Sequence, residues 1–112
     1  MGASHDVNRW WYILDDDGDP VPVDDVATWA RWYETHDRVV AKTDVKGALV
    51  STVFLSLDHA FMTGPPVLYE TMIFGGPFDN YQWRHHNRHE ALAAHDQIVT
   101  ALQRGDEPPE AR

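Results

Sequence analysis

The chain of 112 residues contains no cysteine. Disulfide bonds and thiolate metal sites are therefore excluded, and a reducing compartment is permitted. Positive charge is also scarce, since 9 Lys and Arg face 18 Asp and Glu and the net charge is −9 with neutral His. Nucleic acids are bound mainly by neutralising their phosphates, so this charge argues against a nucleic-acid partner. It is compatible instead with binding a basic protein surface or with mimicking a polyanion.

Long hydrophobic runs are missing as well. The apolar runs are far shorter than the roughly 18–20 residues of a membrane span, and the first eleven residues hold no apolar segment of signal-peptide length. We therefore expect no membrane partner and a cytoplasmic location. The length suits one domain over residues 1–112, with 1–8 and 105–112 flexible.

Hydrophobic periodicity and turn residues predict an α+β fold. Asn87 and Glu90 have the spacing of a capping box at the start of the second helix, and Gly105 stands where a C-cap glycine belongs. The order ββαβββα favours a single antiparallel sheet of about four to five strands with two helices packed on one face. The strands are expected at 10–14, 21–23, 38–43, 49–57 and 67–74, and the helices at about 25–36 and 88–104.

Four histidines lie within residues 85–95. His85, His86 and His89 are weak metal candidates, because a helical zinc site places a second ligand four residues after the first and that position, after His89, is Ala93. We interpret them as solvent-exposed histidines at the helix entrance. No metal and no other cofactor is expected.

His95 differs from the other three. It shares a helical stripe with Leu92, Val99 and Leu102, which predicts that this histidine packs against the sheet. A histidine in such a stripe must form hydrogen bonds or lose solvation energy. It is either a core histidine with a backbone or carboxylate partner, or an imidazole held in a pocket.

Asp58, His59 and Glu70 are the further candidates for acid–base chemistry. If paired positions of the two central strands sum to an even number, Asp58 shares a face with Glu70; an odd sum places His59 there instead. Only the odd register gives a His–carboxylate pair suited to acid–base catalysis. The sequence leaves the register open, and a structural histidine supporting the loop after it is the alternative.

The aromatic content is high, with five Trp, four Tyr and four Phe. Aromatic side chains dominate both cores and interfaces. We expect a contact surface built from aromatic residues, which can also serve as the interface of a homodimer. At least two of its tryptophans are expected to lie partly in the core. The candidates are Trp10, Trp11, Trp32, Trp83 and Tyr69.

The segments VSTVFLSLDHAF (50–61), GPP (64–66) and YETMIFGGP (69–77) resemble a family of small phage and actinobacterial proteins. The family pattern is close to VSTVFLGLDH, a loop with PP, then ETMVFGG and a helix with a Gly-His pair. Asp58, His59, Glu70 and His95 match that pattern, while Ser56 stands in place of a glycine. The resemblance implies a phage or phage-derived accessory protein and brings no activity with it.

Three functions follow as hypotheses. The first is a non-enzymatic accessory protein that binds a host protein or a small ligand, with an anti-defence or host-modulating role in the host cytoplasm. The second is a small hydrolase or nucleotide-processing enzyme that uses His59, Glu70, His95 and Asp58. The third is a minor virion component.

Overall fold

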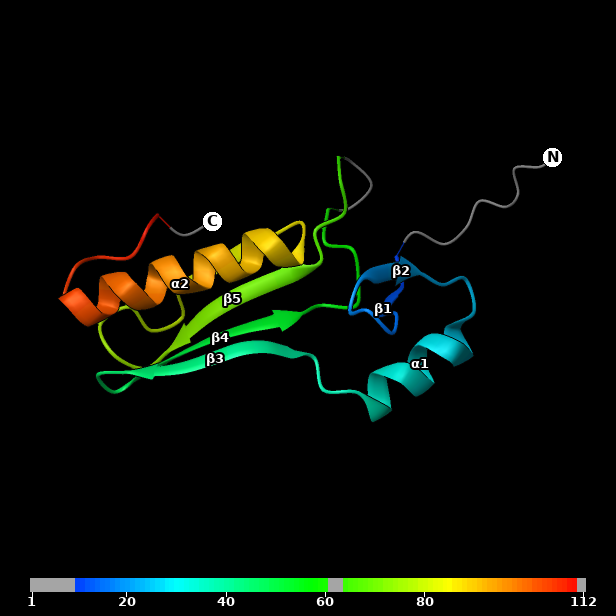
Figure 1. Cartoon of the computed structure of the whole chain (residues 1–112), viewed down its shortest axis with the longest axis horizontal. Coiled ribbons are helices and arrows are strands. Elements are labelled where there is room, and N and C mark those ends of the chain that lie inside the picture. The colour runs from blue at the N-terminus through cyan, green and yellow to red at the C-terminus, as the bar shows by residue number, and fades with distance from the viewer. Residues whose placement is uncertain (1–9, 61–63, 111–112) are drawn as a thin grey trace. The chain divides into compact units, whose positions relative to one another are not determined.

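The computed structural model describes residues 10–60 and 64–110 (Figure 1). The predictions for residues 1–8 and for residues 111–112 lie outside these ranges. The chain divides into two compact units. Unit 1 comprises Met1–Asp37 and Ser56–Pro66, and unit 2 comprises Arg38–Leu55 and Val67–Arg112. No helix of the described residues is long and apolar enough to cross a bilayer.

Unit 1 contains an antiparallel hairpin and one helix. Strands β1 (Tyr12–Leu14) and β2 (Pro20–Pro22) pair around the turn that Asp and Gly residues favour. Helix α1 (Val26–Thr35) begins after Asp25, whose side chain accepts a hydrogen bond from the Ala27 amide. The segment after Leu55 completes the unit, because Leu57 bridges to Trp11.

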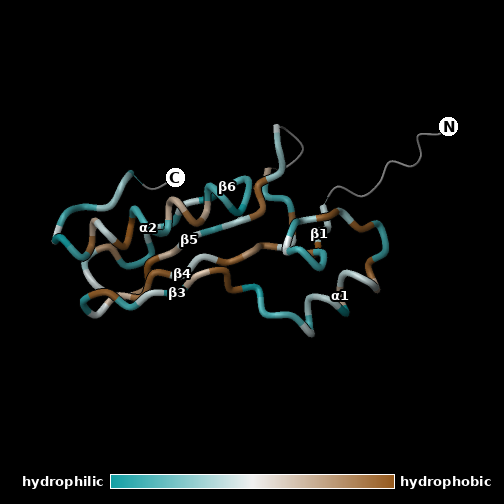
Figure 2. The backbone as a smooth tube through the Cα atoms, in the orientation of Figure 1, coloured by the Kyte–Doolittle hydropathy of each residue, from teal (hydrophilic) through white to brown (hydrophobic). Residues whose placement is uncertain are grey.

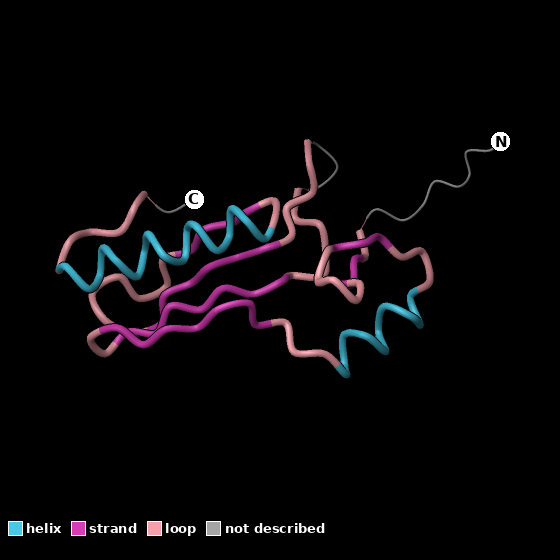
Figure 3. Tube along the Cα trace, viewed as in Figure 1, coloured by secondary structure: helices cyan, strands magenta, loops and turns pink. Residues whose placement is uncertain are grey.

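Unit 2 is a four-stranded antiparallel sheet in the order β3-β4-β5-β6 (Figure 3). Helix α2 contacts all four strands and lies along one face of the sheet (Figure 1). The strands and helix are β3 (Val39–Val45), β4 (Ala48–Phe54), β5 (Tyr69–Phe74), β6 (Gln82–His85) and α2 (Arg88–Arg104).

Helix α2 has the predicted bounds and caps. The Asn87 side chain accepts from the Glu90 amide at 2.9 Å, and the Glu90 carboxylate accepts from the His86 amide at 3.1 Å. Gly105 ends the helix in the left-handed region, with φ 79°. A residue with a Cβ rarely adopts that conformation, so the position favours glycine.

The core of unit 2 follows from strand alternation. Every second residue of β4 and β5 is buried toward α2. The residues between them lie on the other face and are half-buried, except that Phe74 is exposed. Figure 2 shows hydrophobic segments along β4 and both hydrophobic and hydrophilic segments along α2. The packed cluster consists of Ala48, Val50, Ile73, Trp83 and Ile98.

The predicted α+β class is confirmed, and two details differ. The hairpin of unit 1 is a separate two-stranded sheet. Strand β6 lies in a segment where the sequence predicted no strand. Its histidines and arginine concealed the alternation of buried Trp83 and His85 with half-exposed or exposed neighbours. The Trp83 indole N–H donates to the Glu110 carbonyl at 3.1 Å.

Candidate functional site

A polar network runs through the buried layer between α2 and the sheet. His95 is 3% exposed, and its Nε2 lies 2.9 Å from Thr43 Oγ1. Its Nδ1 lies 2.8 Å from Thr52 Oγ1. Thr52 and Thr71 face each other across β4 and β5 with their hydroxyl oxygens 2.6 Å apart. This arrangement confirms the predicted inward orientation of His95.

His85 forms the other end of the same network. Its Nε2 lies 3.0 Å from Thr71 Oγ1, and the residue is 8% exposed. The prediction of an exposed histidine at the helix entrance is therefore wrong for His85. The reason is that β6 continues through this residue and turns its side chain toward α2. We call the five residues Thr43, Thr52, Thr71, His85 and His95 the His–Thr network.

Burial sets the protonation state of both histidines. Desolvation lowers the pKa of His95 below 6.5, while the nearby Asp96 carboxylate opposes the shift. Desolvation also lowers the pKa of His85, against the opposing charges of Glu90 and Glu70. Threonine hydroxyls both donate and accept, so they satisfy a neutral imidazole in either tautomer. The network is thus a set of neutral, satisfied hydrogen bonds at pH 7.

Glu70, one of the predicted acid–base residues, does not face His95. Glu70 lies on the sheet face that points away from α2, where its carboxylate accepts from Arg84 Nε at 3.3 Å. The register of β4 and β5 is odd, with Val53 opposite Glu70. Strand β4 nevertheless ends at Phe54, so this register does not extend to His59.

Asp58 and His59 belong to unit 1 and hold a local turn. The Asp58 carboxylate accepts from the Ala60 amide at 2.8 Å, and His59 Nδ1 lies 3.0 Å from the Leu57 carbonyl oxygen. Both side chains therefore support the local loop, which is the structural role given above as the alternative to acid–base catalysis. The strand prediction failed here because Ser56, with φ 67°, turns the backbone out of the extended region.

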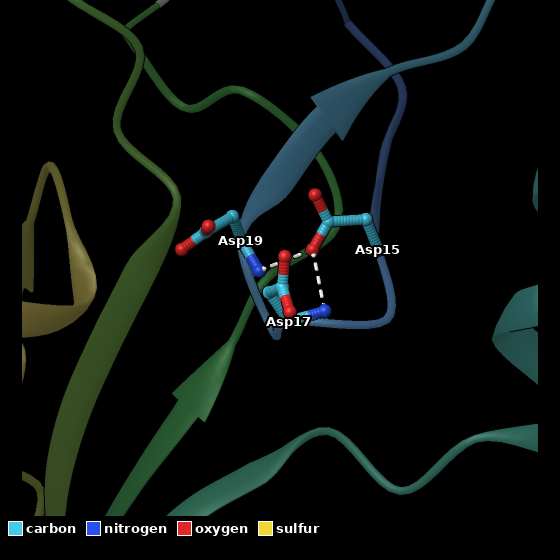
Figure 4. Close-up of side chains that lie close together, drawn as sticks. All are labelled: Asp15, Asp17 and Asp19. Carbon is cyan, nitrogen blue, oxygen red and sulfur yellow. Dashed lines mark hydrogen bonds between the residues drawn. The ribbon is translucent and has the colours of Figure 1, made fainter.

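Metal candidates are few in the described part of the chain. His86 and His89 are exposed, and neither belongs to a cluster of ligating side chains there. Three exposed carboxylates, those of Asp15, Asp17 and Asp19, lie within 4.8 Å of one another (Figure 4). The Asp15 carboxylate already accepts from the Asp17 and Asp19 amides, which is the ordinary chemistry of an Asp-rich turn.

Hollows in unit 2 lie away from the His–Thr network. The larger, about 620 Å³, is an open groove between α2 and the tail at 106–109. The smaller, about 160 Å³, is lined by apolar side chains that include Ile73, Phe78 and Leu102. No residue of the network lines either hollow, so neither gives a ligand access to the imidazoles.

Unit 1 carries a row of aromatic side chains at its surface. Trp11 stacks on Trp29 with ring centroids 6.3 Å apart, and Trp29 contacts Tyr33 at 5.0 Å. Trp10 is 39% exposed and Tyr33 is 36% exposed. We call Trp11, Trp29 and Tyr33 the aromatic row. The spacing of Trp29 and Tyr33 on α1 is typical of the buried face of a helix, but Trp29 is half-buried and Tyr33 is exposed.

Three of the predicted contact residues are part of the interior instead. Tyr69 is fully buried and Trp83 is 6% exposed, both in unit 2. Trp32 is 8% exposed and stacks on His36. The expectation that at least two of the tryptophans are buried is confirmed, and the candidate surface is reduced to Trp10 and Trp11 with Trp29 and Tyr33 added.

Acidic charge is concentrated in the same unit. Among the described residues of unit 1, Arg31 is the one Lys or Arg. The described residues of unit 2 are nearly balanced, with eight acidic and six basic side chains. The acidic residues of unit 1 are Asp15, Asp16, Asp17, Asp19, Asp24, Asp25, Glu34, Asp37 and Asp58.

Ser56 forms hydrogen bonds beneath the aromatic row. Its carbonyl oxygen accepts from the Trp29 indole N–H at 3.1 Å and from the Tyr12 amide at 2.9 Å. The residue is fully buried with φ 67°, and its hydroxyl has no hydrogen-bond partner among the described residues. A serine at this position is therefore strained in its backbone and unsatisfied in its side chain.

We expect Ser56→Gly to raise the free energy of unfolding by about 1–4 kcal/mol. Left-handed backbone costs an L-residue about 1–2 kcal/mol and an unsatisfied buried hydroxyl about 1–3 kcal/mol; the greater freedom of glycine in the unfolded chain offsets about 0.4–1 kcal/mol. Urea denaturation of both proteins measures the difference. Ser56→Ala, which removes only the hydroxyl, should give a smaller gain. A loss of stability in the glycine variant would contradict this account.

No family model, curated protein or solved structure matches the chain.

Proposed function

We propose that the protein is a non-enzymatic binding protein that recognises a basic protein surface through unit 1. The observation that carries the proposal is that the partly exposed aromatic row lies in the same unit as the acidic excess. Tryptophan, tyrosine and arginine supply most of the energetic anchors of protein interfaces. Following the family resemblance, the partner is a host protein met in the cytoplasm, and the role is that of a phage-type accessory protein.

Charge and aromatic surface act together in this proposal. Carboxylates around the surface attract a basic partner and orient its approach. A guanidinium group stacks on the face of Trp or Tyr, and this interaction contributes about 0.5–2 kcal/mol. Arginine is favoured over lysine because its planar group both stacks and binds carboxylates in a bidentate manner. The preferred contact is therefore an arginine-rich segment.

The enzymatic alternative has no comparable support. His95 is buried, with both ring nitrogens bonded to threonine, and Glu70 points away from it with Arg84 as its partner. A general base must reach the proton that it removes from a substrate. No hollow described in unit 2 leads to this imidazole.

Titration with fluorescently labelled peptides tests the proposal. An arginine-rich peptide is expected to bind the full chain more tightly than a lysine-rich peptide of equal charge, with affinity that falls as salt increases. Trp11→Ala should weaken binding of the arginine peptide by about tenfold, the equivalent of 1.4 kcal/mol. The measurement is the dissociation constant from fluorescence anisotropy.

The matched control is Phe74→Ala, which removes an aromatic side chain that is 46% exposed in unit 2. It should leave the affinity unchanged. An equal loss in both variants, or equal binding of an acidic peptide, would refute recognition by the aromatic row.

A further inference from the structure

Strand β3 lies at an edge of the sheet in unit 2, and no described strand pairs with its outer side. It is seven residues long and contains no proline. The outer side of such a strand presents a row of main-chain N–H and C=O groups that can pair with another strand. A second copy of the chain offers the same edge, so an antiparallel pair related by a twofold axis is the simplest closed assembly.

The hairpin between β3 and β4 fixes which residues turn outward. Val45 pairs with Ala48 around a two-residue turn, in which Lys46 has φ 50° and Gly47 has φ 85°. The residues that flank such a turn form a hydrogen-bonded pair, and the direction of the main-chain groups alternates along the strand. Val45 and Thr43 therefore direct these groups toward β4, while Asp44 and Lys42 direct them to the outer edge.

Charge then distinguishes among the registers open to a symmetric pair. Residues whose main-chain groups point to the outer edge must pair with such residues of the partner. Because Lys42 and Asp44 are both even-numbered, the numbers of two paired residues sum to an even number. A sum of 84 places Lys42 opposite the partner's Lys42, and a sum of 88 places Asp44 opposite the partner's Asp44. A sum of 86 places Lys42 opposite the partner's Asp44 twice. Opposite charges across a strand pair are favourable and like charges are unfavourable.

We propose that β3 is a homodimer interface in which two copies pair antiparallel with Thr43 opposite the partner's Thr43. The two sheets join into one of eight strands. Lys42 and Asp44 are both exposed in the single chain and become two symmetric ion pairs. The near balance of charge in unit 2 keeps repulsion between the joined sheets small, because the acidic excess belongs to unit 1. The interface is independent of the aromatic row proposed above.

Cysteine cross-linking reads the register directly, because the natural chain has no cysteine. At the twofold axis Thr43 forms a non-hydrogen-bonded pair, whose Cα atoms are about 4.5 Å apart and within disulfide range. Thr43→Cys is therefore expected to form a covalent dimer in a glutathione redox buffer. Lys42→Cys and Asp44→Cys should form much less, since each lies two residues away from its own copy. Preferential cross-linking of either of these two variants would overturn the register.

Charge reversal tests the interface without cross-linking. Lys42→Asp and Asp44→Lys should each raise the monomer–dimer dissociation constant by about tenfold, because both symmetric pairs become repulsive. The double variant K42D/D44K restores opposite charges and should recover the dimer. Arg88→Asp, a reversal on α2 away from the edge, should have no effect. Sedimentation equilibrium measures each constant, and circular dichroism checks folding. A full chain that stays monomeric at all concentrations, or a dimer indifferent to these reversals, overturns the proposal.

Discussion

Replacing His95 with alanine is expected to lower the free energy of unfolding by about 3 kcal/mol. The substitution leaves a cavity beneath α2, and such cavities in well-packed cores typically cost about 2–5 kcal/mol. It also removes the ring nitrogens that hold Thr43 and Thr52. A domain of this size is stable by only about 5–15 kcal/mol, so the loss should be evident in both urea and thermal denaturation.

Two further variants separate the causes of that loss. His95→Leu refills most of the volume but leaves the Thr43 hydroxyl unpaired, so a large residual loss would assign the effect to hydrogen bonding. His95→Gln keeps a donor and an acceptor and should retain part of the stability. His86→Ala is the matched control, because that side chain is exposed. If His95→Ala were as stable as this control, the network would have no structural role.

Local sequence signals predicted the elements that local physics determines. The bounds of α2 followed from a capping box and a C-cap glycine, which act within a few residues of the chain. The hairpin of β1 and β2 followed from an Asp- and Gly-rich turn. These features need no knowledge of what packs against them.

Tertiary features could not be predicted in this way. His85 is buried because β6 pairs with β5 and turns it toward Thr71, a residue 14 positions away. Threonines in strands are common on exposed faces, so neither Thr52 nor Thr71 indicated a buried network. The sequence held one signal for this strand, the alternation of Trp83 and His85 with polar neighbours. This alternation indicates a strand only if histidine is accepted as a buried residue.

Only part of the aromatic surface could be predicted from the sequence. The high aromatic content indicated that some aromatic side chains lie outside the core. Trp10 is exposed and Trp11 is half-exposed, as expected. The amphipathic pattern of α1, however, favoured burial of Trp29 and Tyr33, because a helix normally covers its apolar face with a larger core. Unit 1 buries Trp32 instead, and the pattern of the helix alone does not indicate this.

The second large effect is expected from acid. The pKa of His85 and that of His95 are both lowered in the folded protein by burial, whereas the unfolded value is 6.5. Between the lowered values and 6.5 the unfolded chain binds more protons than the folded one, so stability rises with pH in this window. The stabilisation is complete above pH 6.5 and is lost as pH falls below it. Each histidine contributes a slope of up to about 1.4 kcal/mol per pH unit.

Unfolding free energies from urea titrations between pH 7.5 and 5 measure this slope. The wild-type slope should approach about 2.7 kcal/mol per pH unit if both histidines stay neutral in the folded state. His95→Gln should reduce it by about half, whatever its absolute stability, because the comparison is between slopes. The matched control His89→Gln, at an exposed position of α2, should keep the wild-type slope. A wild-type slope near zero would mean that the buried imidazoles accept protons without unfolding, and that the neutral state assigned to the His–Thr network is wrong.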